Sequence, residues 1–195
     1  CVLSLGFGSA RVPVDVVWRI LLNKVFGLGE VNWSTGQAHI VWLIRVPRML
    51  LGALVGAGLA LIGAVLQAVT RNPLADPHLL GVTSGATLGA VIVVLHVGDI
   101  IGLLTLPAAA FIAALLSMLV VLGVARRTSP LGRDRPLPCG VAVSFVMMAA
   151  ANLLLFMGDH RAASAVMFWM LGGLGLARWE LLAIPAATVL LGLVL

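Results

Sequence analysis

The side chains best suited to bind a partner are two arginines, Arg45 and Arg48, on either side of Pro47. A guanidinium can bind a carboxylate through two parallel hydrogen bonds, so the pair predicts a docking surface for an acidic partner. Proline favours the first turn of a helix, which would place both cations beside the positive end of the helix dipole. Alternatively, both arginines extend their charges from an apolar helix to the membrane interface. The sequence leaves both interpretations open.

No catalytic grouping accompanies these arginines. The chain has no GxxxxGK[ST] phosphate loop, no HExxH and no supported Ser/His/Asp grouping. Its two cysteines, Cys1 and Cys139, lie far apart and outside any metal-ligand spacing. We therefore predict no enzymatic activity, no metal site and no cofactor, and energy for any transport must come from a separate protein.

A turn follows the apolar stretch after the arginines. Asn72-Pro73 and Asp76-Pro77 lie within six residues, and each proline disfavours the helical conformation of the residue before it. The sequence predicts that one helix ends at Arg71 and that Asp76 caps a new helix beginning at Pro77.

The elements that position these residues are apolar. Hydrophobic residues make up 62% of the chain, charged residues 10%, and the mean hydropathy is +1.16, values typical of an integral membrane protein. Residues 9–44 are predicted to form an extracytoplasmic interfacial loop, partly helical, with tryptophans at headgroup depth. Four transmembrane helices, an outer half-helix and the start of a further helix are predicted, in this order, at 49–69, 79–97, 103–125, 138–157, 162–177 and 181–195.

The arginines also predict the orientation. The loop 126–138 holds four of them, which places it in the cytoplasm by the positive-inside rule. Two spans separate this loop from residues 71–78, so both face the cytoplasm, whereas Arg45 and Arg48 fall outside. The net charge of +5 comes from basic residues that are scattered among the apolar spans. They form no continuous basic surface that could bind nucleic acid.

The runs RVPR, GAGLALIGAVLQ and RNPLADPHLLGVTSGA resemble the signature of FecCD-type permease subunits of bacterial ABC importers for ferric siderophores, haem and cobalamin. CGVAVS and MFWMLGGLG resemble the fifth helix of the same family and the segment after it. The resemblance covers practically the whole chain. It implies an all-α, polytopic transmembrane helix bundle of the type II ABC importer permease kind, with about six of ten helices present and the first and last incomplete.

The resemblance also implies a function. Such a permease dimerises or pairs with a second permease in the bacterial cytoplasmic (inner) membrane. It receives a metal chelate from an extracytoplasmic substrate-binding protein and works with cytoplasmic ATP-binding subunits. A ferric siderophore is the expected cargo, with haem or cobalamin as alternatives.

Residue roles follow from the same resemblance. Arg45 and Arg48 match the docking arginines of the family, and Asp134 and Arg135 are candidates for its cytoplasmic gate. The signature turn of the family corresponds to Arg71, Asn72, Pro73, Asp76 and Pro77. The wall of the translocation path is expected to include Ser144, Asn152, Met167, Met170, Gly172 and Gly173.

Two other interpretations stay open. The chain could be a membrane scaffold that keeps the permease fold without transporting, or a permease remnant that no longer couples to an ATPase. We expect the native reading frame to extend beyond both ends of this chain. Asn152, in the middle of an apolar span, must find a hydrogen-bond partner on a neighbouring helix or in a water-filled path.

Overall fold

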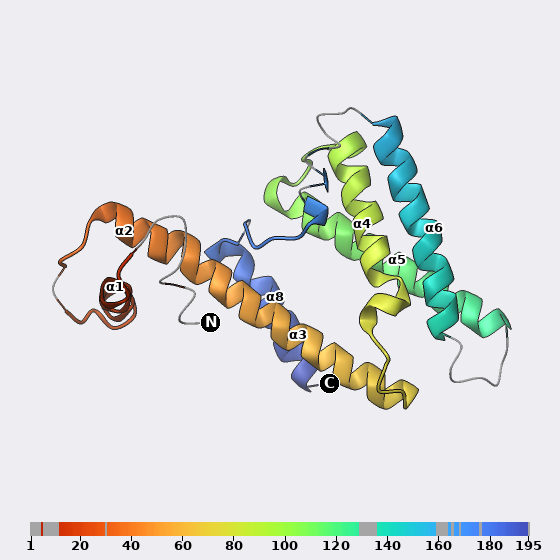
Figure 1. Ribbon diagram of the computed structural model, residues 1–195, viewed down its shortest axis with the longest axis horizontal. Coiled ribbons are helices and arrows are strands. Elements are labelled where there is room, and N and C mark those ends of the chain that lie inside the picture. The colour runs from red at the N-terminus through yellow and green to blue at the C-terminus, as the bar shows by residue number, and fades with distance from the viewer. Residues whose placement is uncertain are drawn as a thin grey trace. The chain divides into compact units, whose positions relative to one another are not determined.

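The fold is helical throughout the part of the chain that the computed structural model describes, and no strand occurs there. The prediction of an all-α fold is thus confirmed. The contacts divide the chain into two units, Cys1–Leu61 with Gly173–Leu195, and Ile62–Gly172, which are described one by one below (Figure 1). The described residues are 5, 12–29, 31–128, 136–158, 164, 166–167, 169–175 and 177–194.

The first unit begins with α1 (Val14–Phe26), which ends at Gly27 in the left-handed conformation, with φ of 69°. After a short connection, Ser34 starts the next helix. The Ser34 hydroxyl accepts a hydrogen bond from the Gln37 amide at 3.2 Å, and the Gln37 side chain accepts one from the Ser34 amide at 3.1 Å. This reciprocal capping box satisfies two amides that a helix start leaves unpaired.

The helix that starts there carries both arginines and is longer than predicted. It runs from α2 (Thr35–His39) through the π-helical η2 (Ile40–Arg45) into α3 (Val46–Thr70). It therefore begins at Thr35 rather than at residue 49, and Pro47 lies inside it rather than in its first turn. The π-helical turn accounts for the difference, because it interrupts the α-helical ladder where the ring and the missing N–H of proline would otherwise break the helix.

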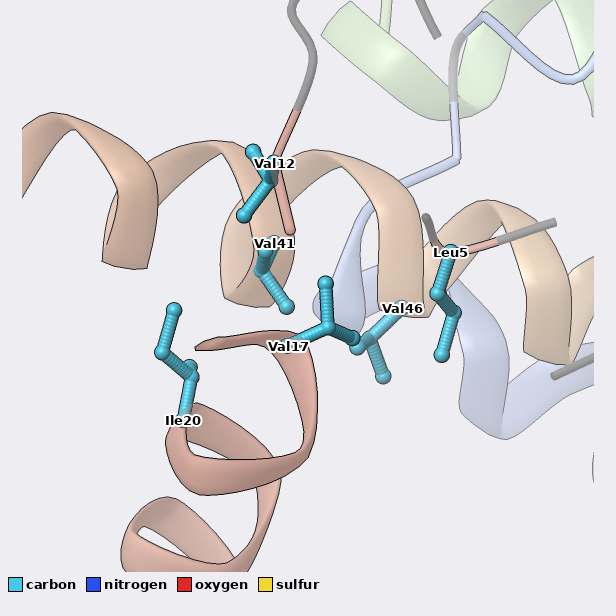
Figure 2. Packing of buried hydrophobic residues seen from close by; sticks show 6 residues of the cluster. All are labelled: Leu5, Val12, Val17, Ile20, Val41 and Val46. Atoms are coloured by element: carbon cyan, nitrogen blue, oxygen red, sulfur yellow. The ribbon is translucent and has the colours of Figure 1, made fainter. Parts of the chain in front are cut away.

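The core of the first unit joins α1 to this long helix. Figure 2 shows its buried side chains pointing toward one another, and each is at most 5% exposed: Leu5, Val12, Val17, Ile20, Val41 and Val46. The C-terminal helix α8 (Trp179–Val194) lies along α3 (Figure 1), where a Cβ atom added at Gly58 would lie 3.4 Å from Val189. The structure thus places α8 close to the predicted range 181–195.

The second unit packs three helices, α4 (Val82–Ile92), α5 (Thr105–Thr128) and α6 (Pro136–Met157), as Figure 1 shows. The π-helical η4 (Val93–Val97) extends α4, and the 3-10 helix η5 (Gly102–Leu104) precedes α5. The predicted helix 79–97 starts later than expected, at Val82. Its first two residues belong to the 3-10 helix η3 (Pro77–Leu80), and Gly81, with φ of 74°, separates the two helices.

Among the described residues, three helical stretches are long and apolar enough to cross a membrane, namely Thr35–Thr70, Gly102–Arg127 and Pro138–Met157. Large apolar side chains point outward from them; Phe145 and Phe156 on α6 are 73% and 87% exposed. Such surfaces are stable in lipid or against other helices but not in water. The predicted half-helix 162–177 is described only in part: Ser164, Val166, Met167, Trp169 and Met170 are helical.

Candidate functional site

The turn predicted around Arg71 is held by its own side chains. Arg71 has a φ of 51°, a left-handed conformation that ends α3 directly after Thr70. The Asn72 side chain accepts a hydrogen bond from the Leu74 amide at 2.9 Å, and the Asp76 side chain accepts one from the His78 amide at 2.6 Å. Both are Asx-type bonds that fold the chain locally. Asp76 therefore caps the helix that begins at Pro77, although that helix is of the 3-10 type.

Gly81 joins this turn to the helices of the second unit. Its carbonyl oxygen accepts three hydrogen bonds: from the Gly85 amide at 3.0 Å, the Ser84 hydroxyl at 3.0 Å and the Ser117 hydroxyl at 2.8 Å. Ser117 belongs to α5 and is fully buried, with 0% of its surface exposed. Ser117 is not among the site residues predicted from the sequence, although a serine in the middle of an apolar span is a polar group that needs a partner.

Glycines bring α4 into close contact with α5. A Cβ atom at Gly85 would lie 2.5 Å from the Cβ of Ser117, and one at Gly89 would lie 2.6 Å from the carbonyl oxygen of Ala109. With Gly81 they stand four residues apart, so they form one stripe along the helix. Small residues at this spacing let two helix backbones approach closely in lipid. The hydrogen bonds at Gly81 thus connect the turn to α4 and α5.

We predict that Ser117→Ala lowers the free energy of unfolding by about 1 kcal/mol, the usual net value of one hydrogen bond between helices. The matched control is Ser144→Ala, because the Ser144 hydroxyl donates only to Gly140 of its own helix, at 2.8 Å. Thermal unfolding in detergent measures the stability of both variants. Equal loss of stability in the two variants would contradict a specific role for Ser117.

The predicted wall residues lie in different surroundings. Ser144 lines an open cavity of about 270 Å³ in the second unit, which is otherwise mostly apolar. Asn152, farther along α6, is exposed, and its side chain makes no hydrogen bond with any described residue. The cavity lining consists of His78, Leu79, Ser84, Val141, Ser144, Phe145 and Met148.

The segment after α6 presents methionines outward. Val166 is buried against Val91 and Ala151, whereas Met167 next to it is 59% exposed and Met170 is 38% exposed. The helical turn ends in a bend at Gly172, whose φ is 76°.

The two arginines differ in their contacts. Arg45 is partly buried, and its guanidinium donates to the carbonyl oxygen of Leu5. Arg48 is exposed on the next turn of the same helix. Because they lie inside a continuous helix, the helix dipole expected at a start does not act on them. The predicted gate residues, Asp134 and Arg135, lie outside the described residues.

The geometry of the described residues offers no metal centre, since no three His, Cys, Asp or Glu side chains among them gather at one place. Buried side-chain polar atoms in this part of the chain all have hydrogen-bond partners. What the arrangement does provide is a close-packed helix unit, an exposed arginine and outward-facing apolar surfaces.

Comparison with known proteins connects these features to one family. The model of the FecCD transport family matches residues 1–195. The chain is 39% identical to the vitamin B12 import system permease protein BtuC of Escherichia coli, over 87% of this chain and 52% of that protein. It is 38% identical to the achromobactin transport system permease protein CbrC of Dickeya dadantii, over 92% of this chain and 49% of that protein.

A further relative and a solved structure indicate the same kind of protein. The ABC transporter permease protein YvrB of Bacillus subtilis, which is described as uncharacterized, is 33% identical over 100% of this chain and 56% of its own length. A solved structure described as an ABC transporter of metal-chelate type, in an inward-facing conformation, superposes with a TM-score of 0.70 at 26% identity, covering 91% of this chain and 58% of that one. The chain spans about half the length of the curated relatives it matches. With its fold, its apolar spans and its signature turn, this integral membrane protein belongs to the FecCD transport family.

Proposed function

We propose that the protein is the transmembrane permease subunit of a binding-protein-dependent ABC importer that moves a metal chelate into the cytoplasm. The observation that carries the proposal is the family match over residues 1–195, in a chain with the fold of a metal-chelate type ABC transporter. The protein itself hydrolyses no ATP in this proposal. A pair of cytoplasmic ATP-binding subunits supplies the energy, and the permease dimerises or pairs in the bacterial cytoplasmic membrane.

A ferric siderophore is our first proposal for the cargo, with cobalamin and haem as alternatives. The relatives include a vitamin B12 permease and an achromobactin permease at 39% and 38% identity, so identity does not favour either cargo. All three cargoes are bulky, and a path lined by small polar and apolar side chains, such as those around Ser144, suits each of them.

Uptake measurements test the proposal. The permease is expressed with its ATP-binding subunits and its substrate-binding protein in cells that lack other importers of this kind. Labelled ferric siderophore, haem and cobalamin are then supplied separately. We expect ATP-dependent uptake of one of them. Uptake of none, with all subunits present and assembled, would instead favour a scaffold that keeps the permease fold.

The exposed position of Asn152 supports the proposal that α6 lines the translocation path. An exposed carboxamide in a membrane span is costly unless water or another polar group meets it, and no described residue does. We predict that Asn152→Leu lowers chelate uptake several-fold and leaves thermal stability unchanged or higher.

The matched control is Gln67→Leu, which removes an exposed carboxamide from α3 that is not assigned to the path. We expect this variant to transport normally. If Asn152→Leu instead lowers stability and separates the permease dimer, the side chain bonds a neighbouring helix, and its place in the path is refuted.

The exposed Arg48 and its neighbour Arg45 are proposed to dock the substrate-binding protein. Arginine suits this task because it can bind acidic residues at the rim of an interface with defined geometry. Such contacts raise the rate of encounter and fix the orientation of the partner.

The turn from Arg71 to Pro77 is proposed to face the cytoplasm, as are the gate candidates Asp134 and Arg135.

A further inference from the structure

The π-helical segment that carries Arg45 leaves one backbone carbonyl without a donor from its own helix. In an α-helix the Trp42 carbonyl would accept from the amide of residue 46, and in a π-helix from that of residue 47. The Val46 amide instead donates to the carbonyl of Val41. Residue 47 is a proline, which has no N–H. Trp42 therefore needs a hydrogen-bond donor from elsewhere.

Trp179, the first residue of α8, supplies this donor. Its indole Nε1 donates to the Trp42 carbonyl oxygen at 2.8 Å, across 137 residues of sequence. The two indole rings also contact each other, with centroids 4.9 Å apart and planes inclined by 33°. The Trp179 N–H thus takes the place of the amide that Pro47 lacks, within the first unit of the protein.

The π-helical turn decides where the arginines point. It inserts one extra residue into the helix, so everything after it is rotated by about 100° relative to a continuous α-helix. Val41, near the start of the π-helical segment, and Val46, directly after it, are both buried in the core around α1. Packing against this core therefore fixes the helix on both sides of the segment. Loss of the π register would turn Arg48 away from its present direction relative to that core.

We propose that Trp179 is a positioning residue for the docking surface formed by Arg45 and Arg48. By bonding the Trp42 carbonyl it stabilises the π register, and through that register it sets the direction of the arginines. This inference rests on the docking role proposed above. Trp179 directly follows residues 173–178, so the same bond also connects the segment after the Gly172 bend to the arginine helix.

Hydrogen exchange of the permease in lipid nanodiscs tests the bond itself. Trp179→Phe keeps a ring against Trp42 but removes the N–H, so the amides between Ile40 and Arg48 should exchange about tenfold faster. Adding Pro47→Ala restores an amide at residue 47, and the double variant should regain most of the protection. Trp42→Phe, which keeps the carbonyl and the N–H, is the control and should leave exchange nearly unchanged.

Affinity for the substrate-binding protein is measured on the same samples. We expect Trp179→Phe to weaken this affinity about tenfold, a factor similar to the increase in hydrogen exchange. Unchanged exchange in Trp179→Phe, an equal effect of Trp42→Phe, or no rescue by Pro47→Ala would each overturn the inference, because ring packing alone would then explain the tryptophan pair. If the exchange results are as expected but the unaltered permease does not bind the binding protein, the docking proposal fails while the bond stands.

Discussion

Replacing Gly140 with alanine is expected to lower the thermal stability of the permease strongly. A Cβ atom at this position would lie 2.1 Å from the Leu79 carbonyl oxygen and 3.0 Å from the Leu80 Cα atom. Both are backbone atoms of η3, so no side chain can rotate to make room, and α6 must move away from the turn. Overpacking of this kind costs roughly 3 kcal/mol, which corresponds to a fall of about 10 °C in the melting temperature.

The matched control is Gly123→Ala on α5. It adds the same methyl group to a neighbouring helix of the second unit, but nothing lies within 4 Å of the added Cβ. Alanine has the higher helix propensity, so this variant should be as stable as the original or more stable by up to about 1 kcal/mol. Fluorescence-detected size-exclusion chromatography after heating in detergent compares the two. Melting temperatures within a degree of each other would show that α6 does not pack on η3 as described.

The turn after α3 could be predicted from the sequence because its causes are local. Pro73 and Pro77 restrict only their own residues and the ones before them, and Asn72 and Asp76 bond amides two residues on. No distant part of the chain is needed. The same applies to the apolar spans, whose composition alone requires lipid or other helices around them.

The start of the arginine helix could not be predicted in this way. The local rule places Pro47 in a first turn, but that rule assumes an α-helix. The chain accommodates Pro47 inside the helix through a π-helical turn, and the exposed carbonyl of that turn is satisfied by Trp179, far away in sequence. A rule for proline that considers only neighbouring residues cannot include the Trp179 N–H, which is distant in the sequence.

The close packing of the second unit was predictable only in part. The four-residue spacing of Gly81, Gly85 and Gly89 indicates a face that another helix approaches, but not which helix. The structure identifies α5, with Ser117 bonded to the Gly81 carbonyl. A stripe of small residues on one helix has many possible partners, and the choice depends on the packing of the whole unit.

Reversing the charges of Arg45 and Arg48 together is expected to abolish binding of the substrate-binding protein to the permease in nanodiscs. Arg48→Glu alone should weaken binding roughly 100-fold, because it leaves carboxylates of the partner facing a like charge. Since Arg48 is exposed, the stability of the permease should not change. High salt should weaken the unaltered complex and have little effect on the residual binding of the variant.

Arg45→Glu should behave differently, because Arg45 also donates to the Leu5 carbonyl. We expect it to weaken docking and, in addition, to speed hydrogen exchange in the core around α1, which Arg48→Glu leaves unchanged. The control is Arg126→Glu, the same charge reversal at the end of α5, which should bind normally. Retained affinity in the double variant would refute the docking surface, and an equal loss in Arg126→Glu would show that total charge, rather than these two arginines, governs the encounter.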